Sequence, residues 1–353
     1  MAKIAIWGSY LWGNFGDDLM AIMTALYLKQ RYHDPIIYKL DATLADFHQL
    51  KTTQNLDELL ANTSALVIGG GGFLGGNSLM DNEWLQLENA LASKKLPIHI
   101  LSIGGDGIAA DPHVSSSACR LMGSHFVRSA SVRLESDIAA LKRINPGLCK
   151  LEQFPDIVFT APSFFPPNKL ASKRRNNTII LNLLRSKPLA FVEASFGLAP
   201  AARTTNLLFA ATHLDHLRKS TAQPKLDYEY QSQHPRKNLR YTGISTHVNA
   251  LAEASAVISN KLHLGVTALA YGTPFFSING APKTQAFMRE SGLNDYSLML
   301  SGRFKTLNFY AGLLLGSFPG GACDAEAIAQ QIKPLKNQSA FHWQMLDAFL
   351  ESE

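Results

Sequence analysis

The alternation of short apolar runs with amphipathic segments constrains the fold of this chain more than any other feature of its sequence. The apolar runs in the first half resemble buried strands, and several are followed by segments with apolar residues at helical spacing. The expected strands cover residues 3–7, 35–40, 65–68, 97–103 and 126–128, and the expected helices cover residues 18–31, 80–93 and 135–143. Repeated strand–helix order predicts a mostly parallel sheet with helices on both faces.

A polar segment interrupts this alternation near the middle of the chain. Residues 161–177 are rich in Pro, Ser, Asn and basic residues, which is typical of a linker or a domain edge. The alternation then restarts, although the polar and basic stretch 219–240 receives no assignment. The expected strands here cover residues 178–184, 206–211, 256–259 and 274–278, and the expected helices lie within 189–198 and at 249–254, 262–271, 325–333 and 341–351. The sequence therefore predicts two similar α/β halves.

The chain has 353 residues, which suggests two domains at roughly 150 residues each. We expect an N-terminal α/β domain over residues 1–165 and a second α/β domain over residues 177–335. A C-terminal helix over residues 336–353 can pack back on the first domain. Ligands of such sheets bind at the carboxyl ends of the strands, so residues directly after each strand are the candidates for a site.

Composition excludes several classes of protein. Hydrophobic residues make up 46% and charged residues 17% of the chain, which is an ordinary globular balance and excludes wholesale disorder. No apolar run reaches the roughly 18 residues of a membrane span, and residues 1–10 read as a first strand rather than a signal peptide. Cys119, Cys149 and Cys323 are too scattered for a metal site or a disulfide framework, which indicates a reducing, cytoplasmic location.

The formal net charge of +5 is a mild basic excess. It fits a nucleic acid, an anionic membrane surface or a small anionic substrate, and the net charge alone does not choose among them. The basic residues are not interleaved with aromatic residues along one stripe, so we expect no nucleic-acid partner.

Two polar residues follow the first expected strand. Asn14 and Asp17 can hydrogen-bond sugar hydroxyls, and Asp17 can act as a base. The alternative is that Asp17 only caps the next helix.

A run of glycines follows the third expected strand. Gly70, Gly72 and Gly75 formally satisfy the G-x-G-x-x-G pattern. The run does not favour a dinucleotide site, because it does not follow the first strand and lacks an acidic residue about 20 positions downstream. A glycine-rich floor beneath a ligand, including Gly71, fits better, and a tight turn without a ligand is the alternative.

Two basic residues lie where an expected helix begins. Leu262, Val266 and Leu269 follow helical spacing toward the core, so Lys261 and His263 project elsewhere in the first turn. The helix dipole disfavours cations there unless an anion compensates, which indicates a site for an anion. The alternative is an exposed lysine beside a hydrogen-bonded histidine.

Three further basic residues follow other strands. Arg133, Arg185 and Lys283 each fit a solvated surface charge when taken alone. If several of them converge, they can hold a small, multiply charged anion.

These segments together resemble the polysaccharide pyruvyltransferase family over roughly residues 4–293. The motifs that carry the resemblance are G-N-F-G-D-D at 13–18, G-G-G-G-F-L at 69–74, V-R-L-E-S at 132–136, P-D-I-V-F at 155–159, K-L-H at 261–263 and A-Y-G-T-P at 270–274. The resemblance implies two Rossmann-like domains with mostly parallel sheets, similar to GT-B glycosyltransferases. It also implies transfer of the enolpyruvyl group of phosphoenolpyruvate to a sugar, which leaves a pyruvate ketal on a cell-surface polysaccharide or exopolysaccharide.

Two positions depart from the family pattern. The family often has Arg at the position of Lys261, and a lysine does not make the planar two-point contact of arginine. The family's G-Q-G-I-G-P segment reads G-D-G-I-A-A at 105–110, which introduces Asp106 near the expected acceptor.

The resemblance implies roles for the candidate residues. Phosphoenolpyruvate is expected as co-substrate, with no other cofactor and no metal, because side chains supply the cations. His263 is the expected acid–base group, since an imidazole both gives and takes a proton near neutral pH, and Asp17 is the second catalytic candidate. The expected donor-binding residues are Lys261, Leu262 through its backbone, Lys283, Arg133 and Arg185, and the expected acceptor-binding residues are Asn14, Asp17, Gly71, Gly72 and Asp106.

Two other functions stay open. A nucleotide-sugar glycosyltransferase of the same architecture can bind a diphosphate at the helix that follows Lys261. A catalytically inactive relative can bind a glycan without releasing phosphate.

The resemblance implies a lipid-linked oligosaccharide as acceptor at the cytoplasmic face of the membrane, where residues 304–318 can make a peripheral contact or form a buried helix. The oligomeric state does not follow from the sequence.

Overall fold

The protein forms two α/β units. The structure, a computed structural model, describes residues 2–72, 78–105, 116–148, 150–167, 178–183, 206–214, 231–300, 305, 309 and 325–353. Unit 1 comprises Met1–Thr160 with Leu335–Glu353, and unit 2 comprises Ala161–Pro334. The chain therefore enters unit 2 after Thr160 and returns to unit 1 within its penultimate helix, α14 (Ala325–Ser339).

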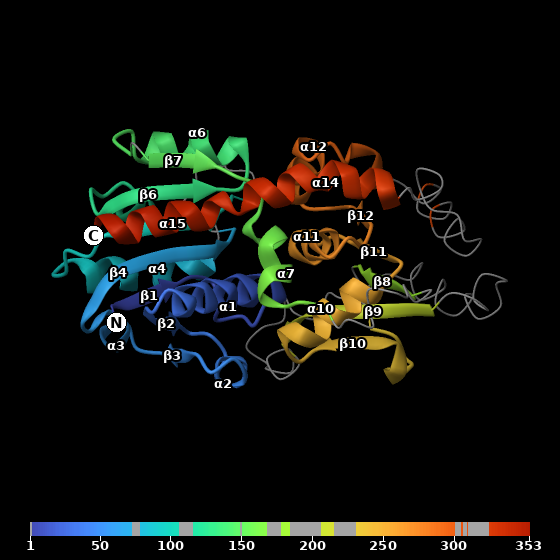
Figure 1. The fold of residues 1–353 in the computed structure, drawn as a ribbon, viewed down its shortest axis with the longest axis horizontal. Helices are drawn as coiled ribbons and strands as arrows, with labels where there is room; N and C mark the ends of the chain where they lie inside the picture. The colour runs from blue at the N-terminus through green and yellow to red at the C-terminus, as the bar shows by residue number, and fades with distance from the viewer. Residues whose placement is uncertain are drawn as a thin grey trace. The chain divides into compact units, whose positions relative to one another are not determined.

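Unit 1 is built on one parallel sheet of seven strands (Figure 1). Its order is β3-β2-β1-β4-β5-β6-β7, so the chain first winds outward to β3 and then continues from β4 on the other side of β1. The strands are β1 (Lys3–Trp7), β2 (Asp34–Tyr38), β3 (Lys51–Thr53), β4 (Thr63–Gly71), β5 (Ile98–Ile103), β6 (Val127–Val132) and β7 (Lys150–Gln153). The helices are α1 (Phe15–Gln30), α2 (Ala42–Phe47), α3 (Leu56–Leu60), α4 (Ser78–Leu91), α5 (Ser116–Met122), α6 (Glu135–Ile144) and α15 (Phe341–Ser352), with a 3-10 turn η2 (Ile157–Thr160). Such a doubly wound sheet opens at its carboxyl edge between β1 and β4, where the direction of winding reverses.

The core of unit 1 lies on both faces of the central strands. Trp7 on β1 contacts Trp84 on α4, with ring centroids 4.5 Å apart. The C-terminal helix α15 packs on β5 and β6, and Phe349 stacks on the buried ring of His99. Residues at the end of the chain therefore complete the first unit.

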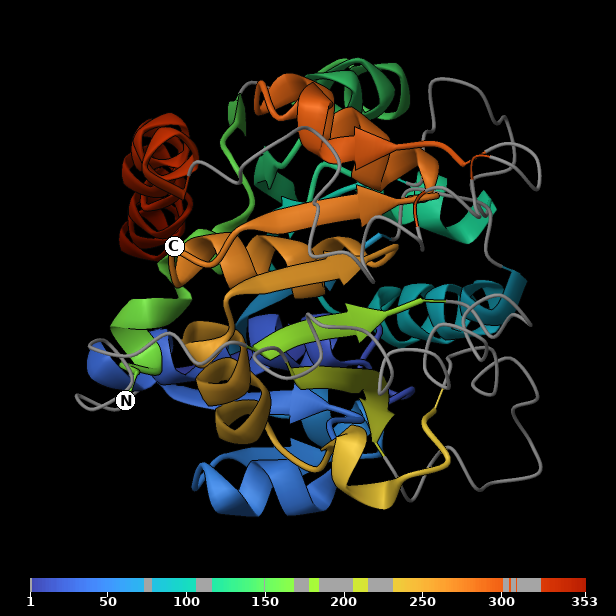
Figure 2. The same ribbon diagram turned by 90° about the vertical axis from the view of Figure 1, so that its right-hand side faces the viewer.

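Unit 2 contains a second parallel sheet, of six strands in the order β10-β9-β8-β11-β12-β13. Figure 2 shows its central strands side by side and pointing in one direction. The strands are β8 (Thr178–Asn182), β9 (Asn206–Leu214), β10 (Asn238–Tyr241), β11 (Ala256–Ser259), β12 (Phe275–Ile278) and β13 (Ser297–Leu298). The helices are α7 (Ala161–Phe164), α10 (Ile244–Glu253), α11 (Leu262–Ala270) and α12 (Pro282–Glu290), with 3-10 turns η6 (Pro235–Lys237) and η7 (Asn294–Tyr296).

Helix α11 packs tightly against the sheet of unit 2. A side chain at Gly265 would lie 2.3 Å from the Phe275 ring, so only glycine lets the helix approach β12 this closely. This packing fixes the start of α11 relative to the ends of β11 and β12.

The expected α/β class with two mostly parallel sheets is confirmed. The short strands β3, β7, β10 and β13 were not expected from the sequence. The expected helix within 189–198 and most of the stretches 161–177, 219–240 and 304–318 lie outside the described residues. Among the described helices, none combines the length and the apolar character that a membrane span needs.

Candidate functional site

The polar residues after β1 lie at the start of α1. Asn14 is the N-cap of this helix, and its Oδ1 accepts a hydrogen bond from Gly16 N at 3.1 Å. The cap is therefore Asn14 and not Asp17, the alternative considered from the sequence. Asp17 is half-buried and Asp18 is buried, both in the first turn, where the helix dipole favours negative charge.

A buried tyrosine connects this segment to the glycine run. The Tyr10 hydroxyl donates to the Gly69 carbonyl oxygen on β4. Burial, and then the nearby charges of Asp17 and Asp18, raise the pKa of Tyr10, so the hydroxyl keeps its proton. Sequence reasoning missed Tyr10, although it lies in the segment between β1 and α1, where site residues were expected.

The end of β4 has a backbone conformation that requires glycine. Gly70 has a φ of 69° and Gly71 a φ of 140°, both in the region that other residues rarely adopt. A side chain at Gly70 would also approach Met20 Cβ to 2.8 Å. The Gly71 carbonyl oxygen accepts hydrogen bonds from Gly104 N and from Arg133 Nη2, each at 3.1 Å.

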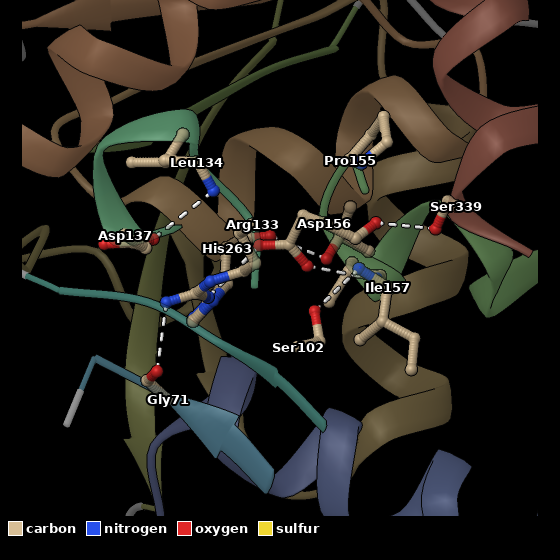
Figure 3. A network of polar contacts seen from close by, with 12 residues as sticks. Gly71, Ser102, Arg133, Leu134, Asp137, Pro155, Asp156, Ile157, His263 and Ser339 are labelled. Atoms are coloured by element: carbon tan, nitrogen blue, oxygen red, sulfur yellow. Dashed lines mark hydrogen bonds and ion pairs between the residues drawn. The ribbon is translucent and has the colours of Figure 1, made fainter. Parts of the chain in front are cut away.

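Arg133 is buried within unit 1, with 5% of its surface exposed. Its Nη1 donates to Asp156 Oδ2 at 3.2 Å, and Figure 3 shows the chain of contacts from Gly71 through Arg133 to Asp156. The structure thus places Arg133 beside Gly71, a residue expected on the acceptor side. Its expected contact with a donor stays a prediction.

Three strand ends therefore gather the expected residues of unit 1 at one edge of the sheet. Asn14 and Asp17 follow β1, Gly71 ends β4 with Gly72 directly after it, and Arg133 follows β6. Asp106 lies outside the described residues.

In unit 2, Lys261 directly precedes α11. Lys261 is the N-cap and supplies no side-chain cap to the helix, while its backbone N–H donates to Ser259 Oγ at 2.8 Å. The Ser259 hydroxyl in turn donates to Asn182 Oδ1 at 3.0 Å. These bonds tie the start of α11 to the ends of β11 and β8.

His263 is the second residue of α11 and is half-buried. Its carbonyl oxygen accepts from Thr267 Oγ1 at 2.6 Å. Leu262, between the two basic residues, turns its side chain into the core, as expected. Without a capping side chain, the first backbone N–H groups of α11 point to where an anion can bind.

Helix α12 starts beside α11, because β11 and β12 are adjacent parallel strands. Its N-cap is Ala281, whose methyl side chain makes no cap hydrogen bond, and Lys283 lies half-buried in its first turn. The structure therefore brings Lys261, His263 and Lys283 to one edge of the sheet of unit 2. Arg185 lies outside the described residues.

In the part of the chain that the structure describes, no group of three or more His, Cys, Asp or Glu side chains is arranged to hold a metal ion. The basic side chains and backbone N–H groups of unit 2 are instead suited to an anionic ligand.

Comparisons with known proteins agree with this architecture. The family model described as polysaccharide pyruvyl transferase matches residues 14–282. A UDP-GlcNAc 2-epimerase from Neisseria meningitidis, solved with UDP-GlcNAc bound, has a TM-score of 0.58 at 11% identity, over 98% of this chain and 99% of that one. A UDP-GlcNAc 2-epimerase from Methanocaldococcus jannaschii has a TM-score of 0.55 at 13% identity, over 96% of this chain and 100% of that one. No curated protein matches the chain. The structural similarities confirm the GT-B-like fold.

Proposed function

Because the chain belongs to the polysaccharide pyruvyl transferase family, we propose that it transfers the enolpyruvyl group of phosphoenolpyruvate to a sugar. The product is a pyruvate ketal on a precursor of a cell-surface polysaccharide, and inorganic phosphate is released.

The start of α11 is the observation that carries this proposal. Lys261 and His263 flank the first residue of a helix whose N-terminus lacks a side-chain cap. Such a terminus binds an anion through its backbone N–H groups and its dipole, and the anion offsets the unfavourable placement of two basic residues. Phosphoenolpyruvate carries a phosphate and a carboxylate, and Lys283 on the neighbouring helix supplies a further cation.

The chemistry requires a proton at one carbon of the donor. Protonation of the methylene carbon leaves an oxocarbenium-like centre at the neighbouring carbon, and a sugar hydroxyl attacks that centre. The bond to phosphate then breaks, and a second hydroxyl closes the ketal ring and gives up its proton as phosphate leaves. His263 is the proposed proton donor, because only an imidazole in this turn both gives and takes a proton near neutral pH.

Unit 1 is the proposed side for the acceptor. Asn14, Asp17 and the backbone of Gly71 and Gly72 lie at its carboxyl edge, where sugar hydroxyls can be hydrogen-bonded. Asp17 is the proposed base for an attacking hydroxyl. The acceptor we propose is a sugar of a lipid-linked oligosaccharide.

A thermal-shift titration tests the donor. We expect phosphoenolpyruvate to stabilise the protein by about 2.7 kcal/mol at a hundredfold excess over its Kd, and the variant Lys261→Ala to lose most of this effect. Arg289→Ala is the matched control, because Arg289 is exposed in the last turn of α12. Stabilisation by UDP or UDP-GlcNAc and not by phosphoenolpyruvate would contradict the proposal and support a nucleotide-sugar glycosyltransferase.

A further inference from the structure

Arg133 follows β6 but bonds to the end of β4, on the far side of β5. A Cβ placed on Gly104, at the end of β5, would lie 2.6 Å from Arg133 Nη2 and 2.7 Å from Nε. The guanidinium therefore lies directly over Gly104, in space that any side chain at position 104 would occupy. Glycine at the end of β5 makes this long-range bond possible.

A second buried charge orients the guanidinium. Asp156 is 2% exposed, and its Oδ2 accepts from Arg133 Nη1 while its Oδ1 accepts from Val158 N at 3.0 Å. The Asp156 carbonyl oxygen accepts from Ser339 Oγ at 2.8 Å (Figure 3). A buried ion pair held by further hydrogen bonds is costly to break, so the guanidinium has one fixed place.

The segment that Arg133 reaches is held at a second point. Tyr10 donates to the Gly69 carbonyl and Arg133 to the Gly71 carbonyl, two residues later. Between them Gly70 has a left-handed backbone with a φ of 69°. Gly69 and Gly71 also pair with β5, and the two side-chain donors hold the carbonyl groups on either side of the left-handed Gly70.

We infer that Arg133, oriented by Asp156, is a positioning residue that holds Gly71 and Gly72 in the conformation in which their backbone meets the sugar acceptor. This inference rests on the proposed acceptor role of Gly71 and Gly72. It is an alternative to the donor contact that the resemblance implies for Arg133. The charge of Arg133 is already compensated by Asp156, and nearly all of its surface is buried. A small anion would therefore bind only weakly to this guanidinium.

Two variants disturb this contact in different ways. Arg133→Lys keeps the charge and removes the fork that reaches both Gly71 and Asp156. Gly104→Ala keeps Arg133 and Asp156 and displaces the guanidinium, because the added Cβ would lie within 3.0 Å of Nη2, Nε and Cζ. Arg128→Lys is the matched control, since Arg128 lies on β6, the strand that Arg133 follows, is exposed and pairs with Glu353 at 3.5 Å.

Three measurements decide the inference. In both variants, hydrogen exchange of the segment 69–72 should become about tenfold faster, as expected for loss of one hydrogen bond to a charged group. Calorimetric affinity for phosphoenolpyruvate should stay at the wild-type value. With a panel of 4-nitrophenyl hexosides as acceptors, KM for the sugar should rise about tenfold, with KM for phosphoenolpyruvate unchanged.

The double variant should show about the same effect as each single one, because both act through one contact. A loss of phosphoenolpyruvate affinity with wild-type exchange at 69–72 would overturn the inference and make Arg133 a donor contact. If the wild-type protein did not bind phosphoenolpyruvate, the proposed function would fail, while the exchange at 69–72 would still decide whether Arg133 positions this segment.

Discussion

Lys261 and His263 lie on either side of Leu262, the first residue of α11, and their side chains differ in chemistry. Only His263 can deliver a proton near neutral pH, whereas Lys261 supplies a fixed charge. We predict that His263→Ala lowers turnover by about 10²–10⁴-fold and keeps part of the donor affinity. Lys261→Ala should mainly weaken donor binding. Phosphate release and calorimetric donor affinity measure the two effects.

A structural role for His263 predicts a different outcome. The His263→Ala protein would then melt at a lower temperature, and its folded fraction would keep ordinary activity. That result would remove His263 from the mechanism and direct attention to Asp17, the second catalytic candidate.

Two buried histidines in unit 1 make stability depend on pH. Burial lowers the pKa of His99 and of His342 to about 3. In the unfolded chain these rings take up protons near pH 6.5, so below that pH the unfolded state binds protons that the folded state does not. The free energy of unfolding should therefore fall as pH decreases from about 6.5 toward 3, by up to about 1.4 kcal/mol per pH unit for each histidine.

Urea unfolding between about pH 7.5 and about pH 5.5 measures this slope. His342→Gln should be less stable at neutral pH, because His342 bonds to Ser131 and to the Pro155 carbonyl, but its slope should be shallower. His125→Gln, at an exposed site, is the control and should keep the wild-type slope. An unchanged slope in His342→Gln would contradict the prediction.

Among the elements, α1 depends on a single cap. The Asn14 side chain accepts from Gly16 N, so Asn14→Ala should lower the free energy of unfolding by about 1 kcal/mol. Asn14→Asp keeps an acceptor at the cap and should stay within about 0.5 kcal/mol of wild type. Unchanged phosphoenolpyruvate affinity in both variants would exclude Asn14 from donor binding. Equal stability of Asn14→Ala and wild type would contradict the capping role.

The elements that the sequence predicted are those with the strongest local signal. β1 and β11 are continuous apolar runs buried on both faces, and the structure has them where the sequence predicted. β3 and β7 were not predicted, because these edge strands are short and partly exposed and their side chains follow no apolar pattern. The helix α12 was also missed, since its sequence PKTQAFMRE is mostly polar.

The residues of the candidate site were also predicted only in part. Residues after strands were predicted, because a parallel sheet gathers strand ends at one edge. The partners of those residues were not. Asp156 lies 23 positions from Arg133, and only the fold brings the two side chains together. Tyr10 had no motif to single it out, and its bond to Gly69 depends on the register of β1 beside β4.

At the scale of the whole molecule, the last helix of the chain belongs to the first unit. Trp343 on α15 is 5% exposed, stacks on Tyr27 with centroids 4.3 Å apart and donates to Thr160 Oγ1 at 3.0 Å. We predict that Trp343→Ala lowers the free energy of unfolding by about 3–5 kcal/mol and speeds hydrogen exchange in β5 and β6.

Phe341→Ala is the control for this prediction, because Phe341 begins the same helix and is 43% exposed. Its cost should stay below about 1 kcal/mol. Faster exchange confined to the strands of unit 2 in Trp343→Ala would show that α15 does not stabilise unit 1.

The most direct test of the account is mass spectrometry of sugar acceptors incubated with the protein and phosphoenolpyruvate. The account predicts that one acceptor gains the mass of pyruvate less one water, that an equal amount of phosphate appears, and that His263→Ala abolishes both. An acceptor that instead gains a hexose from a nucleotide sugar, with no change in the presence of phosphoenolpyruvate, would contradict it.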